Sequence, residues 1–167
     1  MVAPALPSRD DVMRILGEVM DPEVPVISVV ELGIIRDVAI ESGRVTVTVT
    51  PTYSGCPAMH VIEDDVRAAL ARFGCTDVRV ETVYAPAWTT DWIGPEAREK
   101  LRAFGIAPPG RAENDGLVTL GRRRAPVRCP YCGSANTQLR SEFGSTACKA
   151  IHVCDACRQP FDEFKAI

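Results

Sequence analysis

Two Cys-x-x-Cys pairs near the C-terminus constrain the fold of this chain more than any other feature. The first pair begins at Cys129 and the second at Cys154, and 21 residues separate the two pairs. This spacing lets each pair supply two thiolates to one tetrahedral ion, and four thiolates leave no position open for a substrate or a water molecule. The predicted ligands are Cys129, Cys132, Cys154 and Cys157. We therefore predict a structural zinc site in a zinc ribbon over residues 127–167.

The metal and the remaining thiol of the tail each allow a second interpretation. The Cys-Pro-x-Cys-Gly motif that begins at Cys129 also suits iron in a rubredoxin-like site, although the second pair lacks the matching proline and glycine. In either case a unit of about 40 residues has too little core to fold without its metal. Cys148 is the extra thiol, either a small packed side chain or a group that hands over metal or docks a partner.

The distribution of charge also divides the chain into two parts. Residues 1–110 carry 10 basic and 16 acidic side chains, whereas residues 111–167 carry 9 and 6. The net charge of −3 provides no concentrated basic face for nucleic acid, and no apolar run approaches the roughly 18 residues of a membrane span. The first eight residues lack the regions of a secretory signal. We expect a cytoplasmic protein whose seven cysteines serve metal or thiol chemistry.

The periodicity of the first part predicts alternating helices and strands. Apolar residues recur at helical spacing after Ser8, after Pro57 and over 95–104. The predicted strands, rich in β-branched residues, cover 32–40, 45–50 and 77–84. The order α-β-β-α-β-α predicts an α+β protein, a small α/β sandwich with its helices on one sheet face. We place this domain at residues 1–107 and a polar linker at 108–126, with a short strand at 117–120.

Cys56 is the most informative cysteine of the first part. A tight turn over 51–55 leads into Cys56-Pro57, and because proline favours the first helical position, Cys56 is the predicted N-cap. The positive end of the helix dipole would lower the pKa of this thiol, and His60, one turn later, could be a second ligand. Equally, Cys56 would cap and pack while His60 is solvated. Neither a hydrolase motif nor a nucleotide-binding glycine motif accompanies them.

Three further motifs resemble a known family. In one-letter code, the segment from Asp21 reads DPEVPVISVVELGII, the segment from Thr50 reads TPTYSGCPAM and the segment from Pro86 reads PAWT. In order and spacing they resemble the SufT-like metal–sulfur cluster assembly domain family over about residues 8–107. With the zinc ribbon and the motif FGSTACKA at 143–150, the whole chain resembles the PaaD-like accessory subunits of the phenylacetyl-CoA epoxidase, or phenylacetate-CoA oxygenase.

This resemblance implies a non-catalytic accessory role in aerobic phenylacetate degradation, as a maturation factor that assists assembly of iron or iron–sulfur centres. Epoxidation itself needs a di-iron carboxylate site with Glu-x-x-His pairs, which this sequence lacks. The family's reactive cysteine corresponds to Cys56 and its acidic loop to Asp21 and Glu23, with His60 as a helper. The two acids could instead close a solvated turn. The implied partners are subunits of the oxygenase or its reductase, and a homodimer is compatible with the sequence.

Two other functions fit parts of the sequence. In the first, the tail cysteines hold a four-thiolate iron centre that passes electrons to the oxygenase. In the second, both parts only bind partner subunits as a scaffold. Colour separates the zinc and iron versions, because a zinc protein is colourless and four-thiolate iron absorbs visible light.

Overall fold

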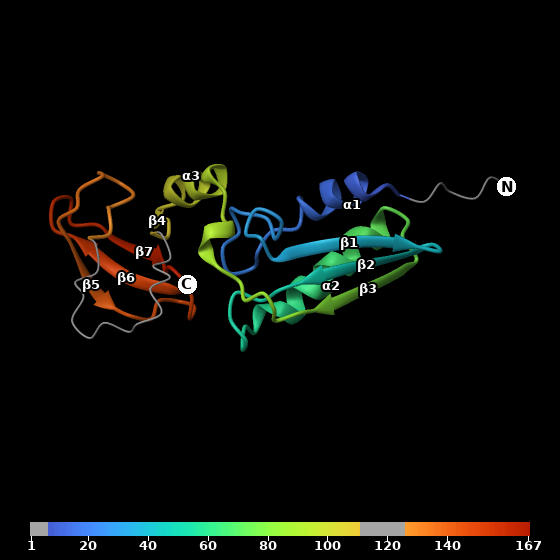
Figure 1. Cartoon of the computed structure of the whole chain (residues 1–167). Helices are drawn as coiled ribbons and strands as arrows, with labels where there is room; N and C mark the ends of the chain where they lie inside the picture. Colours follow the sequence, from blue (N-terminus) through green and yellow to red (C-terminus); the bar gives the residue numbers. More distant parts are fainter. Residues whose placement is uncertain (1–6, 111–125) are drawn as a thin grey trace. The chain divides into compact units, whose positions relative to one another are not determined.

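The structure, a computed structural model, describes residues 7–110 and 126–167, and it divides into two compact units between Trp88 and Thr89. The described residues form three α-helices and two separate sheets (Figure 1), which confirms the predicted α+β class. Within these ranges, no helix combines the length and the apolar character needed to cross a membrane.

The sheet of the first unit has three strands. They are β1 (Ile35–Glu41), β2 (Arg44–Val49) and β3 (Asp77–Thr82), in the order β1-β2-β3. β1 and β2 form an antiparallel hairpin, whereas β2 and β3 are parallel. In β2 the valines are buried and the threonines between them are half-buried, as the period-two pattern predicts. One face of the sheet therefore carries the core.

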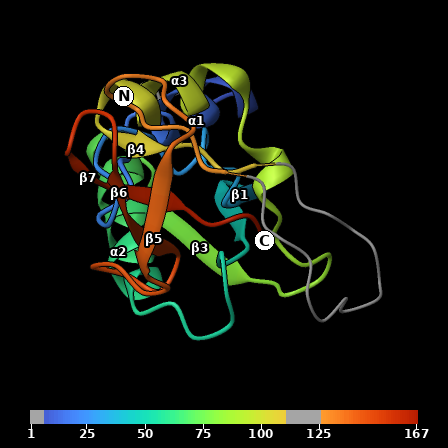
Figure 2. The same cartoon turned by 90° about the vertical axis from the view of Figure 1, so that its left-hand side faces the viewer.

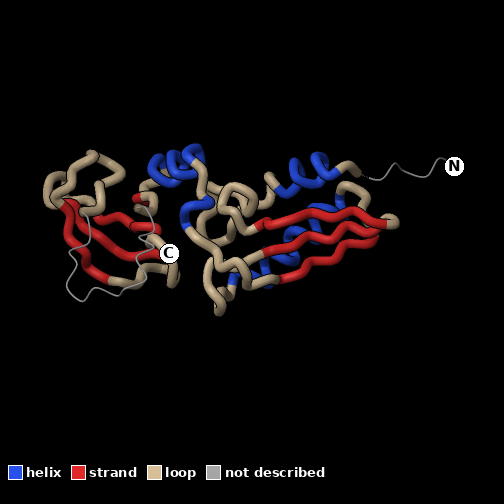
Figure 3. Tube along the Cα trace, viewed as in Figure 1, coloured by secondary structure: helices blue, strands red, loops and turns tan. Residues whose placement is uncertain are grey.

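Two helices cover that buried face. α1 (Arg9–Leu16) begins at Ser8, whose side chain forms a capping box with Asp11. α2 (Ala58–Arg72) connects β2 to β3 and runs along one face of the sheet, as Figure 1 shows, while α1 packs on α2 and β1. Because β2 and β3 are parallel, both strands end where α2 begins. Figure 3 shows loop and turn segments, drawn in tan, gathered at this end of the sheet.

The first strand starts three residues later than the pattern predicts. Residues 29–33 form turns instead of extended backbone, and Leu32 donates its N–H to the carbonyl of Ser28. Gly33 then adopts a φ of 77°, a left-handed conformation that favours glycine. The apolar run over 32–34 is buried in this turn, so burial alone did not distinguish a turn from a strand.

The second unit combines a short helical segment with a four-stranded sheet. The helices are η1 (Thr90–Trp92) and α3 (Pro95–Ala103). The sheet, in the order β4-β7-β6-β5 and visible in Figure 2, contains β4 (Ile106–Ala107), β5 (Thr137–Ser141), β6 (Lys149–Cys154) and β7 (Pro160–Phe164). Its core contains Ala107, Cys129, Cys154 and Phe161, with Val127 and Cys157 packed against them. The ribbon core is therefore small and includes three of the predicted metal ligands.

The division between the units differs from the boundary expected at residue 107. In the structure, residues 89–107 belong with the ribbon because β4 pairs with β7. Thr90 reinforces this arrangement, because its N–H donates to the carbonyl of Ile167 at 3.1 Å. The strand expected at 117–120, and most of the expected linker, lie outside the described residues.

Candidate functional site

Four cysteine sulfur atoms of the second unit converge on one point. The Sγ atoms of Cys129, Cys132, Cys154 and Cys157 all lie within 4.8 Å of one another. The Cys129–Cys157 pair is 3.7 Å apart and the Cys132–Cys154 pair is 3.6 Å apart. Tetrahedral zinc with Zn–S bonds of about 2.3 Å separates its sulfurs by about 3.8 Å. The four side chains therefore fit one tetrahedral ion, and they leave no ligand position open.

The pKa values of these thiols show that a bound cation would have to displace protons from some of the sulfurs. The backbone N–H of Cys157 lowers the pKa of the Cys154 thiol to about 7. At Cys132 the backbone N–H of Ser134 favours the thiolate, but desolvation and the neighbouring cysteines outweigh it and raise the pKa to about 12. Crowded sulfurs resist a second negative charge. A bound dication would remove this repulsion and allow the remaining protons to leave.

Cys148 lies outside this four-sulfur cluster. Its side chain is buried, and its sulfur lies 3.0 Å from the hydroxyl oxygen of Thr146 in the loop between β5 and β6. Nearby in the sheet, His152 stacks on Phe161 with ring centroids 5.4 Å apart. The Nε2 atom of His152 lies 2.8 Å from a carboxylate oxygen of Glu163. The extra thiol is therefore buried in the ribbon and is not a fifth donor to the cluster.

Cys56, in the first unit, lies at the end of the sheet where α2 begins. The prediction that it is the N-cap of this helix is wrong, because the N-cap is Pro57 and the helix begins at Ala58. The N–H of Cys56 donates to the carbonyl of Tyr53 at 3.2 Å, and its carbonyl accepts from Met59 at 3.4 Å. Proline follows directly and has already entered helical backbone angles, so Cys56 falls one position before the N-cap and two positions before the first helical residue.

Asp21 and Glu23 lie within electrostatic range of Cys56, whose side chain is half-buried. The charges of Glu23 and Asp21 both act on the Cys56 thiol, and Thr52 hydrogen-bonds with its sulfur. Asp21 is buried, and its Oδ1 accepts from the N–H groups of Glu23 at 2.9 Å and of Val24 at 2.7 Å. Asp21 is therefore not the solvated acid of the alternative interpretation. We refer to Asp21, Glu23, Thr52 and Cys56 as the thiol site.

The environment of this site raises the pKa of the Cys56 thiol, which reverses the direction expected from the helix dipole. Burial is the largest cause, and the charges of Glu23 and Asp21 add to it. The N–H of Ala58 and the side chain of Thr52 oppose these effects without overcoming them. Cys56 therefore carries a protonated thiol at neutral pH, although it lies close to a helix N-terminus.

The structure differs most from the site predicted from the sequence at His60 and Thr52. His60 is exposed on the first turn of α2, and none of the interactions between described residues joins it to Cys56. Thr52, in contrast, was missed although it is buried and contacts the thiol. Its place in a turn four residues before the cysteine was the available signal, because threonine hydroxyls in turns commonly bond to nearby groups.

Two family models match consecutive parts of this chain. The model described as an iron-sulfur cluster assembly protein matches residues 9–83, which contain the whole thiol site. The model described as the PaaD zinc beta ribbon domain matches residues 113–165, which contain the four-sulfur cluster.

Similar proteins and structures agree with this division. A protein of Escherichia coli K12, named as a component of a "Putative 1,2-phenylacetyl-CoA epoxidase", is 45% identical over 163 residues, covering 98% of this chain and 96% of the relative. A protein of Porphyromonas gingivalis W83 named Fe-S protein maturation auxiliary factor is 38% identical over 98 residues, covering 58% of this chain and 92% of the relative. A crystal structure of a domain of unknown function (DUF59) from Bacillus anthracis has a TM-score of 0.52 and 29% identity, covering 56% of this chain and 90% of that structure.

Proposed function

Because this chain belongs to the PaaD family, and joins an iron–sulfur cluster assembly domain to a zinc ribbon, we propose that it is a non-catalytic maturation factor for a multicomponent phenylacetyl-CoA epoxidase. In this role it assists the assembly of iron or iron–sulfur centres in the oxygenase. The observation that supports this best is the thiol site, where the charges of Glu23 and Asp21 act on the half-buried Cys56 thiol, in a domain similar to maturation factors.

The thiol site suits iron as a transient cargo. A soft sulfur and hard carboxylate oxygens together match the ligand preferences of iron better than those of magnesium or calcium. Without a cation, burial raises the pKa of the Cys56 thiol and the charges of the two acids raise it further, so the thiol stays protonated. A positive charge placed beside Glu23 and Asp21 would reverse that effect and favour the thiolate, so the arriving cargo would itself cause Cys56 to release its proton.

The four-sulfur cluster takes a different part in this proposal. Cys129, Cys132, Cys154 and Cys157 would hold zinc, and the bound zinc would stabilise the second unit without taking part in transfer. Support comes from the sulfur spacing and from the closed four-thiolate ligand set. We expect freshly purified protein to be colourless and to contain about one zinc per chain. Visible absorption with iron in place of zinc would instead support the electron-transfer function.

The oxygenase as recipient is supported by the relative that matches nearly the whole chain. That protein is named as part of a phenylacetyl-CoA epoxidase, and the similarity includes both units. We therefore propose that the partners of this chain are subunits of the oxygenase or its reductase. The expected contact is transient, because a factor that loads metal centres has to leave its recipient afterwards.

The decisive experiment compares Cys56→Ser with Cys148→Ser in cells that grow on phenylacetate. We expect Cys56→Ser to give iron-poor, inactive oxygenase and poor growth, because a hydroxyl binds iron weakly at neutral pH. Cys148→Ser makes the same atomic change outside both sites and should leave oxygenase iron normal. Levels of the two variants must be matched, since lost abundance imitates lost function. Normal iron content with Cys56→Ser would leave the scaffold function as the better explanation.

A further inference from the structure

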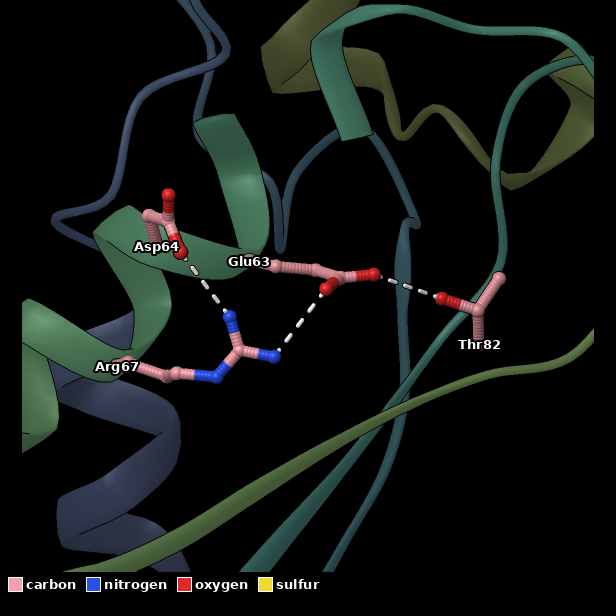
Figure 4. A network of polar contacts seen from close by, with 4 residues as sticks. All are labelled: Glu63, Asp64, Arg67 and Thr82. Atoms are coloured by element: carbon pink, nitrogen blue, oxygen red, sulfur yellow. Dashed lines mark hydrogen bonds and ion pairs between the residues drawn. The ribbon is translucent and has the colours of Figure 1, made fainter. Parts of the chain in front are cut away.

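Glu63 connects α2 to the end of β3 through both of its carboxylate oxygens. Oε1 accepts a hydrogen bond from the Thr82 hydroxyl at 3.0 Å, and Oε2 accepts from Arg67 at 3.2 Å, as Figure 4 shows. Arg67 also donates to Asp64 at 3.1 Å. The Glu63 side chain is only 22% exposed, whereas that of Asp64 is 80% exposed. The shielded part of this network is therefore the link between Glu63 and Thr82.

A second link attaches the turn before Cys56 to the same place. Thr50 donates its hydroxyl to the carbonyl of Val83 at 3.0 Å, and the N–H of Val83 donates to the carbonyl of Val49 at 2.8 Å. Thr82 and Val83 are neighbours in the chain. The segment before Cys56 and the helix after it are thus both attached to two adjacent residues at the end of β3.

The start of α2 has few other local stabilisers. Its N-cap, Pro57, makes no side-chain capping hydrogen bond, and its first turn contains no acidic residue. A side-chain cap typically contributes about 1 kcal/mol to a helix, and an acid in the first turn adds to it. Without these, the position of the first turns of α2 depends on contacts such as the one between Glu63 and Thr82.

We infer that Thr82 and Glu63 are positioning residues for Cys56, because their hydrogen bond holds the first turns of α2, which begins two residues after Cys56. The link joins α2 to the end of β3 and does not touch the sulfur. This inference rests on the proposed function in one respect, which is that Cys56 is the working thiol. The hydroxyl of Thr82 is the group that matters, not the size of its side chain.

The test is the rate at which iodoacetamide alkylates Cys56 in the zinc-loaded full chain, read on the Cys56 peptide by mass spectrometry at one pH. Thr82→Val keeps the shape of the side chain and removes the hydroxyl, and Thr82→Ser keeps the hydroxyl. We expect Thr82→Val to raise the rate on the order of tenfold, since a lost hydrogen bond to a charged group permits local opening of that order. Thr82→Ser should restore a rate close to that of the wild type.

Thr48→Val is the matched control, because it makes the same change on the neighbouring strand, on the sheet face away from α2. Amide exchange of β2 should stay at wild-type rates in all three variants, which separates local opening from general loss of stability. A wild-type alkylation rate in Thr82→Val, or an equally high rate in Thr82→Ser, would overturn the inference. If Thr82→Val does not fold, Glu63→Met removes the same bond from the other side and is judged by the same criteria.

The metal-handling role of Cys56 and the positioning role of Thr82 and Glu63 can each be refuted without refuting the other. The alkylation experiment reports how Cys56 is held, whether or not that thiol carries iron. Normal oxygenase iron in the Cys56→Ser strain would remove the metal-handling role and leave the positioning result standing. An unchanged alkylation rate would remove the positioning role and leave the iron measurement standing.

Discussion

At the scale of single residues, the thiol of Cys56 is controlled more by what surrounds it than by the helix that follows it. Burial raises its pKa, and the carboxylates of Glu23 and Asp21 raise it further. At the start of α2, the N–H of Ala58 lowers the pKa of this thiol but does not outweigh these effects. A cysteine in this setting is unreactive until something positive approaches it.

Neutralising one of the two acids should make Cys56 easier to deprotonate. In metal-free protein we expect the midpoint of the pH profile of Cys56 alkylation to lie above that of an unperturbed thiol. Glu23→Gln should lower the midpoint, because a negative charge that opposes the thiolate is lost. The midpoint should nevertheless stay above the unperturbed value, since burial is the larger cause. Glu41→Gln, at the far end of β1, should leave the profile unchanged; an equal shift there would contradict the local explanation.

The residues of the thiol site could be predicted only in part. The sequence identifies Cys56 and the two acids as candidates, and in the structure the charges of both acids act on the thiol. The direction of the pKa was missed because it depends on a helix that starts one residue later than expected and on burial by distant segments. Thr52 was missed for a related reason, since a turn motif does not reveal which group its hydroxyl will face. His60 was included because it shares a helix with Cys56, yet its side chain is exposed.

At the scale of elements, the loops of the first unit are held by specific buried contacts. Trp88 is 4% exposed, and its indole N–H donates to the carbonyl of Leu32 at 3.0 Å. This bond joins the end of the unit to the turn that precedes β1, across 56 positions in the chain. Asp21 performs a similar task within the preceding loop by accepting two backbone N–H groups.

Replacing Trp88 by phenylalanine should destabilise the first unit without affecting metal content. The change removes the indole N–H and leaves the Leu32 carbonyl buried without that donor, which costs about 1–3 kcal/mol of unfolding free energy. The measurement is amide exchange of β2 under increasing urea, with zinc content as a check on the second unit. Tyr84→Phe, at a side chain that is 63% exposed, serves as the control and should change little. Equal effects of the two changes would refute the role of the buried bond.

The main elements of the first unit could be predicted from local pattern, and their pairing in the second unit could not. Alternating valines identified β2 because they report directly on burial of one face. β4 has only two residues, and it exists because β7 provides a parallel partner from far along the chain. No local pattern in two residues reveals such a partner, so the sequence places the boundary at residue 107, whereas the division in the structure lies between Trp88 and Thr89.

At the scale of the whole molecule, the two units depend on different sources of stability. The first unit has a core made largely of aliphatic side chains from α1, α2, β1, β2 and the loop between α1 and β1. In the second unit, a cluster of Ala107, Cys129, Cys154 and Phe161 surrounds the metal ligands, while Leu101, Ile106 and Phe164 are buried elsewhere in the unit. The ribbon residues 126–167 bury only two large apolar side chains of their own, Phe161 and Phe164, so the metal is expected to supply much of their stability.

Loss of one ligand should therefore unfold the second unit and spare the first. Each thiolate is a quarter of the coordination in modules whose apparent zinc binding is worth about 10–16 kcal/mol. We expect Cys129→Ser or Cys157→Ser to lose zinc and to make residues 126–167 sensitive to protease, while the first unit stays protected. Cys148→Ser should retain zinc and protection. A protected tail without metal in the ligand variants would show that zinc is dispensable for the fold.

The short strand β4 also determines which residues would have to be transferred together if the ribbon were moved to another protein by recombination. The similarity to the ribbon model starts at residue 113, whereas Ala107 of β4 lies in the ribbon's core beside Cys129 and Cys154. A segment cut at residue 113 and grafted onto another gene would lose β4 and expose one edge of β7. A transplanted ribbon with a complete sheet therefore has to include β4, so the structural module is longer than the region that sequence similarity outlines.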